Sequence, residues 1–179
     1  MNFYKIFLPH WDNPLRDDIS IADYFGTTPG ITRYPEDILA LSLREDIVAR
    51  GLKIKEVQVF ISPGPYVMKI HIDGLEFNNN HCAVNWVVSE SNNWNMTWYN
   101  YTGNNIMGQA NSAGTLYLQP PPSECIKIET QRWTGPALVN VGVPHRVVNL
   151  SHSLRYCVSL RFEHGEDEDD FDYVKSALI

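Results

Sequence analysis

The chain has 179 residues, which is the length of one domain and is enough to bury a sizeable core without disulfide or metal staples. Its formal net charge is −7, with 14 lysines and arginines against 21 aspartates and glutamates. This balance argues against a protein that binds nucleic acid through a broad basic face. We therefore expect a single domain over residues 1–179 with no nucleic-acid partner.

The cysteines and the apolar segments indicate a cellular compartment. Cys82, Cys125 and Cys157 are widely spaced and form no CxxC pair, so we expect buried free thiols and neither a disulfide framework nor a zinc site. The apolar opening over residues 1–9 is too short for a signal peptide, and no stretch approaches the length needed to span a bilayer. These features predict a cytoplasmic protein with no membrane partner.

Residues 1–52 are expected to form an irregular N-terminal wrap followed by a helix. The first 35 residues are rich in Pro, Gly, Asp and aromatics, with short helical turns around Ile19 to Phe25. From Pro35 to Arg50 apolar residues recur at helical spacing, acids occupy the first turn, and Gly51 stands where a helix end favours glycine. The pattern predicts a helix from Pro35 to Arg50.

From residue 53 the hydrophobic period changes to two, which predicts strands. Val57, Val59 and Ile61 alternate with more polar neighbours, and a Ser-Pro-Gly-Pro turn leads into a strand from Tyr66 to Asp73. Further strands are predicted at His81 to Ser89, Asn95 to Tyr101, Thr115 to Gln119, Glu124 to Gln131, Ala137 to Val143 and Leu154 to Phe162. We expect a mainly β, all-β body over residues 53–162, arranged as a double-sheet jelly roll with the N-terminal helix packed on it. The acidic run that follows predicts a solvated, mobile tail over 163–179.

His71 and Asp73 stand two residues apart on a predicted strand, so their side chains should point into one cavity. Met68, Ile70 and Ile72 are then expected on the opposite side. Taken alone, the pair is more typical of a surface His and Asp at a strand end. Two other such spacings, His10-Trp11-Asp12 and His164-Gly165-Glu166, lie off the predicted strands and are expected at the surface.

A third ligand and an arginine complete the pattern. His145 follows a long apolar strand, and two imidazoles with one carboxylate can hold one face of octahedral Fe(II) and leave three positions open. On the last predicted strand, alternate residues share one face: Arg155, Cys157, Ser159 and Arg161. An unpaired buried guanidinium is too costly to persist, so Arg155 needs an anionic partner, either a bound 2-oxo acid or a structural Asp or Glu.

His71-x-Asp73, His145 and Arg155 ten residues later resemble the Fe(II)/2-oxoglutarate-dependent oxygenases. The stretch from Pro144 to Asn149 with the strand after Leu154 resembles the aspartyl/asparaginyl β-hydroxylase branch, and the resemblance covers residues 57–162. It implies a double-stranded β-helix of the cupin type in which His71, Asp73 and His145 hold iron. It also implies that Arg155 binds the distal carboxylate of 2-oxoglutarate, and that an amino-acid side chain, free or in a polypeptide, is hydroxylated with O2.

The sequence differs from that branch in two ways, and it leaves several assignments open. The best-known aspartyl β-hydroxylases lack the acidic ligand that Asp73 supplies, and the arginine and histidine that those enzymes place after the first ligand are not evident here. Asn85 could reach the cofactor carboxylate instead, or be a satisfied core amide. His152 and Arg161 form a rival pair nine residues apart.

The sequence also allows other roles for some side chains and two other functions for the protein. The aromatics of the middle strands could line a substrate mouth, although core packing is the expected role of Trp86, Trp94, Trp98, Tyr99 and Tyr101. Lys69 is expected at the cavity rim. A cupin-type metalloenzyme that lacks 2-oxoglutarate and holds its substrate on Arg155 is one alternative function. A non-catalytic jelly-roll binding protein, in which His71 and His145 never meet, is the other.

Overall fold

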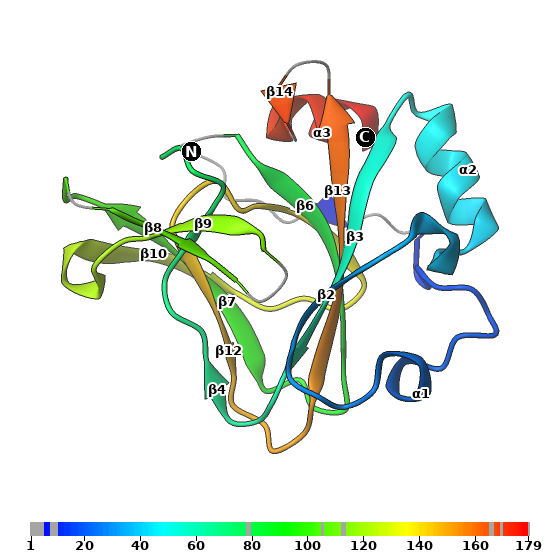
Figure 1. The fold of residues 1–179 in the computed structure, drawn as a ribbon, viewed down its shortest axis with the longest axis horizontal. Coiled ribbons are helices and arrows are strands. Elements are labelled where there is room, and N and C mark those ends of the chain that lie inside the picture. Colours follow the sequence, from blue (N-terminus) through cyan, green and yellow to red (C-terminus); the bar gives the residue numbers. More distant parts are fainter. Residues whose placement is uncertain are drawn as a thin grey trace.

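The computed structural model describes residues 6–7, 11–77, 80–104, 106–111, 114–164, 167–168 and 170–178. Within them the chain is mainly β, and every strand pair is antiparallel (Figure 1). The helices are α1 (Ile21–Phe25), α2 (Leu41–Ala49) and α3 (Phe171–Leu178). The strands are β1 (Ile6–Phe7), β2 (Gly30–Tyr34), β3 (Lys53–Ser62), β4 (Tyr66–Val67), β5 (Ile72–Asp73), β6 (Cys82–Ser89), β7 (Trp94–Tyr101), β8 (Met107–Ala110), β9 (Leu116–Gln119), β10 (Cys125–Gln131), β11 (Pro136–Asn140), β12 (His145–Asn149), β13 (Arg155–His164) and β14 (Asp167–Glu168).

The strands form three sheets. The largest has the order β1-β11-β6-β13-β3-β2, with β14 added to β13. A second sheet has the order β10-β7-β12-β4, and a third, smaller sheet has the order β5-β9-β8. None of the helices in the described ranges is long and apolar enough to cross a membrane.

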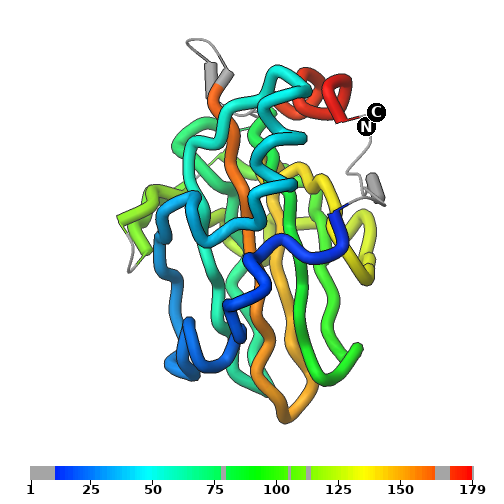
Figure 2. Tube along the Cα trace, turned by 90° about the vertical axis from the view of Figure 1, so that its right-hand side faces the viewer, coloured from blue at the N-terminus to red at the C-terminus, as the bar shows by residue number. Residues whose placement is uncertain are grey.

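The two faces of strand β13 point to different places, one to the hydrophobic core and the other to a cavity. Its residues Tyr156, Val158 and Leu160 belong to the main core, together with Leu43 and Ile47 of α2. Its alternate residues line the cavity, as the period-two pattern predicted: Arg155, Cys157, Ser159 and Arg161. In Figure 2 the segment that carries α2 lies across the face of the sheet that contains β3, β13 and β6.

The predicted helix from Pro35 to Arg50 is wrong at its start. A 3₁₀ turn (Glu36–Ile38) comes first, Leu39 is extended, Ala40 is also not helical, and α2 begins only at Leu41. The break has a tertiary cause, because Leu39 is fully buried and the neighbouring backbone bonds to an earlier segment: Arg16 N–H donates to Ile38 O, and Ala40 N–H donates to Pro14 O, each at 3.0 Å. These contacts override the helical period.

The end of the helix agrees with the prediction. Gly51 has φ +74°, a left-handed conformation that favours glycine. Its N–H donates to Val48 O at 2.9 Å, and the N–H of Leu52 donates to Ile47 O at 3.1 Å. This pair of bonds is the Schellman arrangement that ends a helix.

The predicted strand from Tyr66 to Asp73 is split in two. β4 pairs with β12, whereas β5 pairs with β9, so the chain changes partner between them. The change shifts the alternation: Ile70 and Ile72 are buried as expected, but Met68 lines the cavity instead of the opposite side. Strands β1, β2, β8, β12 and β14 were not predicted: β1 and β14 are two residues long, and the sequences of the other three carry no clear alternation.

The expectation of a solvated tail is wrong for residues 171–178. They form α3, in which Phe171, Val174 and Leu178 are buried in the main core. Arg50 of the segment after α2 donates to the carbonyls of Ala177 and Leu178, each at 3.2 Å. The sequence does contain apolar residues at helical spacing, three and four positions apart, at Phe171, Val174 and Leu178. The acidic residues before them led to the expectation of a solvated tail.

Replacing Phe171 with alanine is expected to lower the free energy of unfolding by about 3 kcal/mol, because the change removes a buried ring from the core. Urea denaturation followed by circular dichroism measures the loss. Ser176 is exposed on the same helix, so Ser176→Ala should change the free energy by less than about 0.5 kcal/mol. Equal, small effects of both changes would contradict the docking of α3.

Candidate metal centre

His71 and His145 are direct neighbours across two paired backbone segments. The N–H of His71 donates to His145 O at 2.9 Å, and the N–H of His145 donates to His71 O at 2.8 Å. Residues opposed in this way place their side chains on the same face. The two imidazole centroids accordingly lie 4.3 Å apart.

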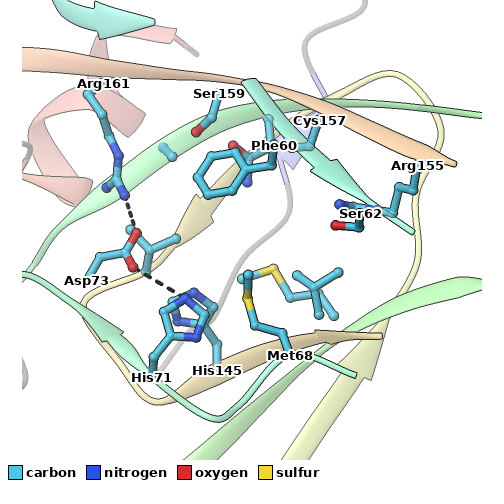
Figure 3. Close-up of a pocket in the computed structure, with 15 residues that line it drawn as sticks. Phe60, Ser62, Met68, His71, Asp73, His145, Arg155, Cys157, Ser159 and Arg161 are labelled. Carbon is cyan, nitrogen blue, oxygen red and sulfur yellow. Dashed lines mark hydrogen bonds and ion pairs between the residues drawn. The ribbon is translucent and has the colours of Figure 1, made fainter. Parts of the chain in front are cut away.

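Asp73 joins them because it lies two residues after His71 and points to the same side (Figure 3). One donor atom from each of His71, Asp73 and His145 can be chosen so that all three lie within 4.8 Å of one another. His71 Nε2 lies 3.5 Å from Asp73 Oδ1. The structure therefore brings together the three residues that the sequence singled out, in a cluster close to metal-binding geometry.

Backbone carbonyls orient both imidazoles. His71 Nδ1 lies 3.0 Å from Lys69 O, and His145 Nδ1 lies 2.9 Å from Val143 O. A carbonyl can only accept a hydrogen bond, so the neutral form of either ring carries its proton on Nδ1. The lone pair of each Nε2 is then free to bind a metal, and the bond at Nδ1 fixes the ring orientation.

Charge in the cluster suits a cation. Burial, and next the neighbouring His71, lower the pKa of His145 to about 3, so its imidazole is neutral at pH 7. Burial by itself would raise the pKa of Asp73, but Arg161, His71 and His145 outweigh it and the pKa is lowered. Neutral imidazoles and an ionised carboxylate are the forms that bind divalent transition metals. By its donor chemistry, the cluster fits a divalent transition metal.

The rival pair of His152 and Arg161 is not supported. His152 is exposed in the turn between β12 and β13 and is not part of the cluster. Arg161 contacts Asp73 through Nη2 and donates from Nη1 to Cys82 O at 3.0 Å. Arg161 therefore forms an ion pair with the carboxylate of the cluster.

The cluster lies at one end of a cavity between the two larger sheets. β3, β6 and β13 supply one wall, while β7 and β12 supply residues of the other. The lining residues outside the cluster are Phe60, Ser62, Met68, Ala83, Asn85, Met96, Val141, Val147, Arg155, Cys157, Ser159 and Arg161. In Figure 3, Arg155 lies at the end of the cavity away from Asp73, beyond Met68 and Phe60.

Arg155 is buried without an acidic partner among the described residues. Its guanidinium carbon lies 4.7 Å from the centroid of the Trp94 ring, and its Nε has no hydrogen-bond partner. Burial lowers the pKa of Arg155, and the neighbouring Cys157 thiol opposes that shift. No structural Asp or Glu satisfies the guanidinium within the described part of the chain, so its positive charge lies in the cavity without an acidic partner there.

Other predicted residues take the following places. Asn85 lines the cavity, and its buried Oδ1 has no hydrogen-bond partner, so it is not a satisfied core amide. Lys69 is exposed and contributes its backbone carbonyl to the site. The five aromatics are buried and act as packing residues, as expected: Trp86, Trp94, Trp98, Tyr99 and Tyr101. The three cysteines are free, and Cys82 and Cys157 are buried. His10 and the Gly165-Glu166 pair lie outside the described residues.

Sequence reasoning missed two contacts of the cluster. Tyr117 of β9 packs edge-on against His71, with ring centroids 5.9 Å apart. Arg161 was expected on the right face but not at Asp73. Both contacts depend on long-range strand pairing, β5 with β9 and β13 with β6, for which no local pattern gives a signal.

Comparisons with known proteins add little. No protein-family model matches the chain, and no curated protein matches it significantly. Among solved structures, the X-ray structure of E. coli ycfD is similar to 63% of this chain, with 18% sequence identity and a TM-score of 0.36. The similar region spans 27% of that chain, and a likeness this weak carries no argument about fold or function.

Proposed function

We propose that the protein is an Fe(II)- and 2-oxoglutarate-dependent dioxygenase that hydroxylates an amino-acid side chain, free or in a polypeptide. The observation that carries the proposal is the pairing, within one cavity, of the His71, Asp73 and His145 cluster with a buried arginine that has no acidic partner among the described residues. A metal site alone would not require Arg155. A ligand that joins the two ends of the cavity would require both.

The proposal includes a fold. Two antiparallel sheets contribute opposite walls of the cavity, and this arrangement supports a double-stranded β-helix of the jelly-roll or cupin type. In such a fold the cavity between the sheets is the usual place for a small ligand.

His71, Asp73 and His145 would hold the metal, each through one donor atom. When bound, Fe(II) would activate O2, the oxidant, and 2-oxoglutarate would supply two of the four electrons that O2 accepts: one atom of O2 would enter the substrate C–H bond, the other would enter succinate, and carbon dioxide would leave. The chain itself binds, orients and excludes water. Arg155 would hold the far carboxylate through its planar fork, and the Trp94 ring under the guanidinium keeps that fork in place.

Apolar side chains between the cluster and Arg155 would exclude water from the cavity. Phe60 and Met68 lie between the cluster and Arg155 (Figure 3), and Met96 and Val147 belong to the same lining. They leave little room for bulk water around the bound acid, which strengthens the interaction between its carboxylate and Arg155. Asn85, with its unpartnered amide oxygen, is the remaining polar group that could contact the acid or the substrate.

The purified protein is expected to convert 2-oxoglutarate slowly to succinate and carbon dioxide without any added prime substrate. The assay supplies Fe(II), ascorbate and O2, and succinate is measured by mass spectrometry. A chelated, metal-free sample is the control. Absence of succinate above that control, in protein shown to contain Fe(II), would favour a metalloenzyme that uses Arg155 for its substrate or a protein without catalytic activity.

A further inference from the structure

Arg161 holds one of the two carboxylate oxygens of Asp73. Its Nη2 contacts Asp73 Oδ2, and its Nη1 donates to Cys82 O at 3.0 Å. The arginine side chain is 6% exposed, so no solvent competes strongly for these contacts. The guanidinium is fixed from two sides, by β5 and by β6.

The two oxygens of Asp73 consequently have different surroundings. Oδ1 faces the imidazoles and lies 3.5 Å from His71 Nε2, whereas Oδ2 is turned toward Arg161, as the dashed lines in Figure 3 show. A carboxylate can bind a metal through one oxygen or through both. With Oδ2 occupied by a guanidinium, only Oδ1 is directed at the centre of the cluster.

We propose that Arg161 is a positioning residue that confines Asp73 to a single bond with the metal. The inference rests on the proposed metal site. Six coordination positions less three protein donors leave three open, enough for a chelating 2-oxo acid and for O2. If Asp73 bound through both oxygens, one of these three positions would be lost, and the chelating 2-oxo acid and O2 could not be bound at the same time.

A purely structural role of Arg161 makes a different prediction. Breaking a buried ion pair destabilises a fold, because the remaining charge has no partner. Such a loss would lower the free energy of unfolding but leave the coordination of a bound metal unchanged. The number of water molecules on the metal therefore separates the two roles, and it is measurable without any cosubstrate.

The test uses the full chain loaded with Mn(II), and water-proton relaxation counts the exchangeable waters on the metal. Wild-type protein is expected to carry about three waters. Arg161→Met removes the donor to Oδ2 and keeps an apolar stem, so the count should fall to about two. Arg161→Lys, which retains one charged donor, should restore about three. Arg161→Gln is a second neutral variant in case the methionine variant does not fold, and it should also carry about two.

Arg155→Met is the matched control, because Arg155 lies on the same strand and the same face, is also buried, and lies at the other end of the cavity from Asp73 (Figure 3). It should carry about three waters. Three waters on a folded neutral Arg161 variant, or two on the wild type, would overturn the proposal for Arg161. Failure of wild-type protein to bind Mn(II) would instead overturn the metal site itself, so the two failures are distinguishable.

Discussion

Alanine at His145 or at His71 is expected to abolish tight Fe(II) binding. Each change removes one of the three donors of the cluster, and two backbone hydrogen bonds and two carbonyl contacts hold the two imidazoles on one face. Loss of outer-shell partners costs about 10–100-fold in metal affinity, so loss of a ligand should cost more than about 100-fold. Isothermal titration calorimetry with Mn(II) or Ni(II) as inert surrogates measures the affinity.

His152→Ala is the control for this prediction. His152 is exposed in the turn after β12 and outside the cluster, so its removal should leave the metal affinity nearly unchanged. If His152→Ala alone removed the metal, the assignment of the third ligand to His145 would be wrong. If all three variants kept wild-type affinity, the cluster would not be a metal site.

Changes at Arg155 should weaken 2-oxoglutarate binding in the order Arg, Lys, Ala while metal binding survives. Lysine keeps the positive charge but loses the bidentate fork, and alanine loses both. A hydrogen bond to a charged group is worth about 1.5 to 3 kcal/mol, which corresponds to about one to two decades in affinity. Burial of the guanidinium favours the upper end of that range. Anaerobic titration of 2-oxoglutarate into the Fe(II) protein measures the order.

Arg146 offers a matched control for Arg155. It follows His145 directly, so its side chain lies on the opposite face of β12. Arg146 is opposite Thr97 of β7, its guanidinium lies over the Tyr99 ring, and it does not line the cavity. Arg146→Ala should therefore leave the 2-oxoglutarate affinity within about threefold of wild type. Equal losses at Arg146 and Arg155 would indicate a general effect of charge and not a specific anchor.

Much of the site could be predicted because it depends on local periodicity. Alternation along residues 155–162 placed the two arginines on the face that lines the cavity, and the two-residue spacing of His71 and Asp73 placed both side chains together. The apolar strand before His145 drew attention to this residue, but the structure ends that strand at Asn140 and places His145 at the start of β12, where pairing with His71 fixes it. In the first two cases the signal lies within one short extended segment.

The rest depends on contacts between distant segments. The bond between Asp73 and Arg161 joins residues 88 positions apart, and nothing near either residue indicates it. The helix break at Leu39 follows from hydrogen bonds to Pro14 and Arg16. Composition was misleading for α3, because the acids before Phe171 suggested a solvated tail and outweighed a short apolar stripe.

The anaerobic titration of 2-oxoglutarate tests the central claim most directly, because Fe(II) chelated by a 2-oxo acid has a visible metal-to-ligand charge-transfer absorption. Wild-type protein loaded with Fe(II) is expected to develop this absorption and to saturate. Arg155→Ala should need about 10–100-fold more 2-oxoglutarate to reach the same signal. No absorption at saturating 2-oxoglutarate in wild-type protein shown to contain Fe(II), or an unchanged affinity in Arg155→Ala, would contradict the account.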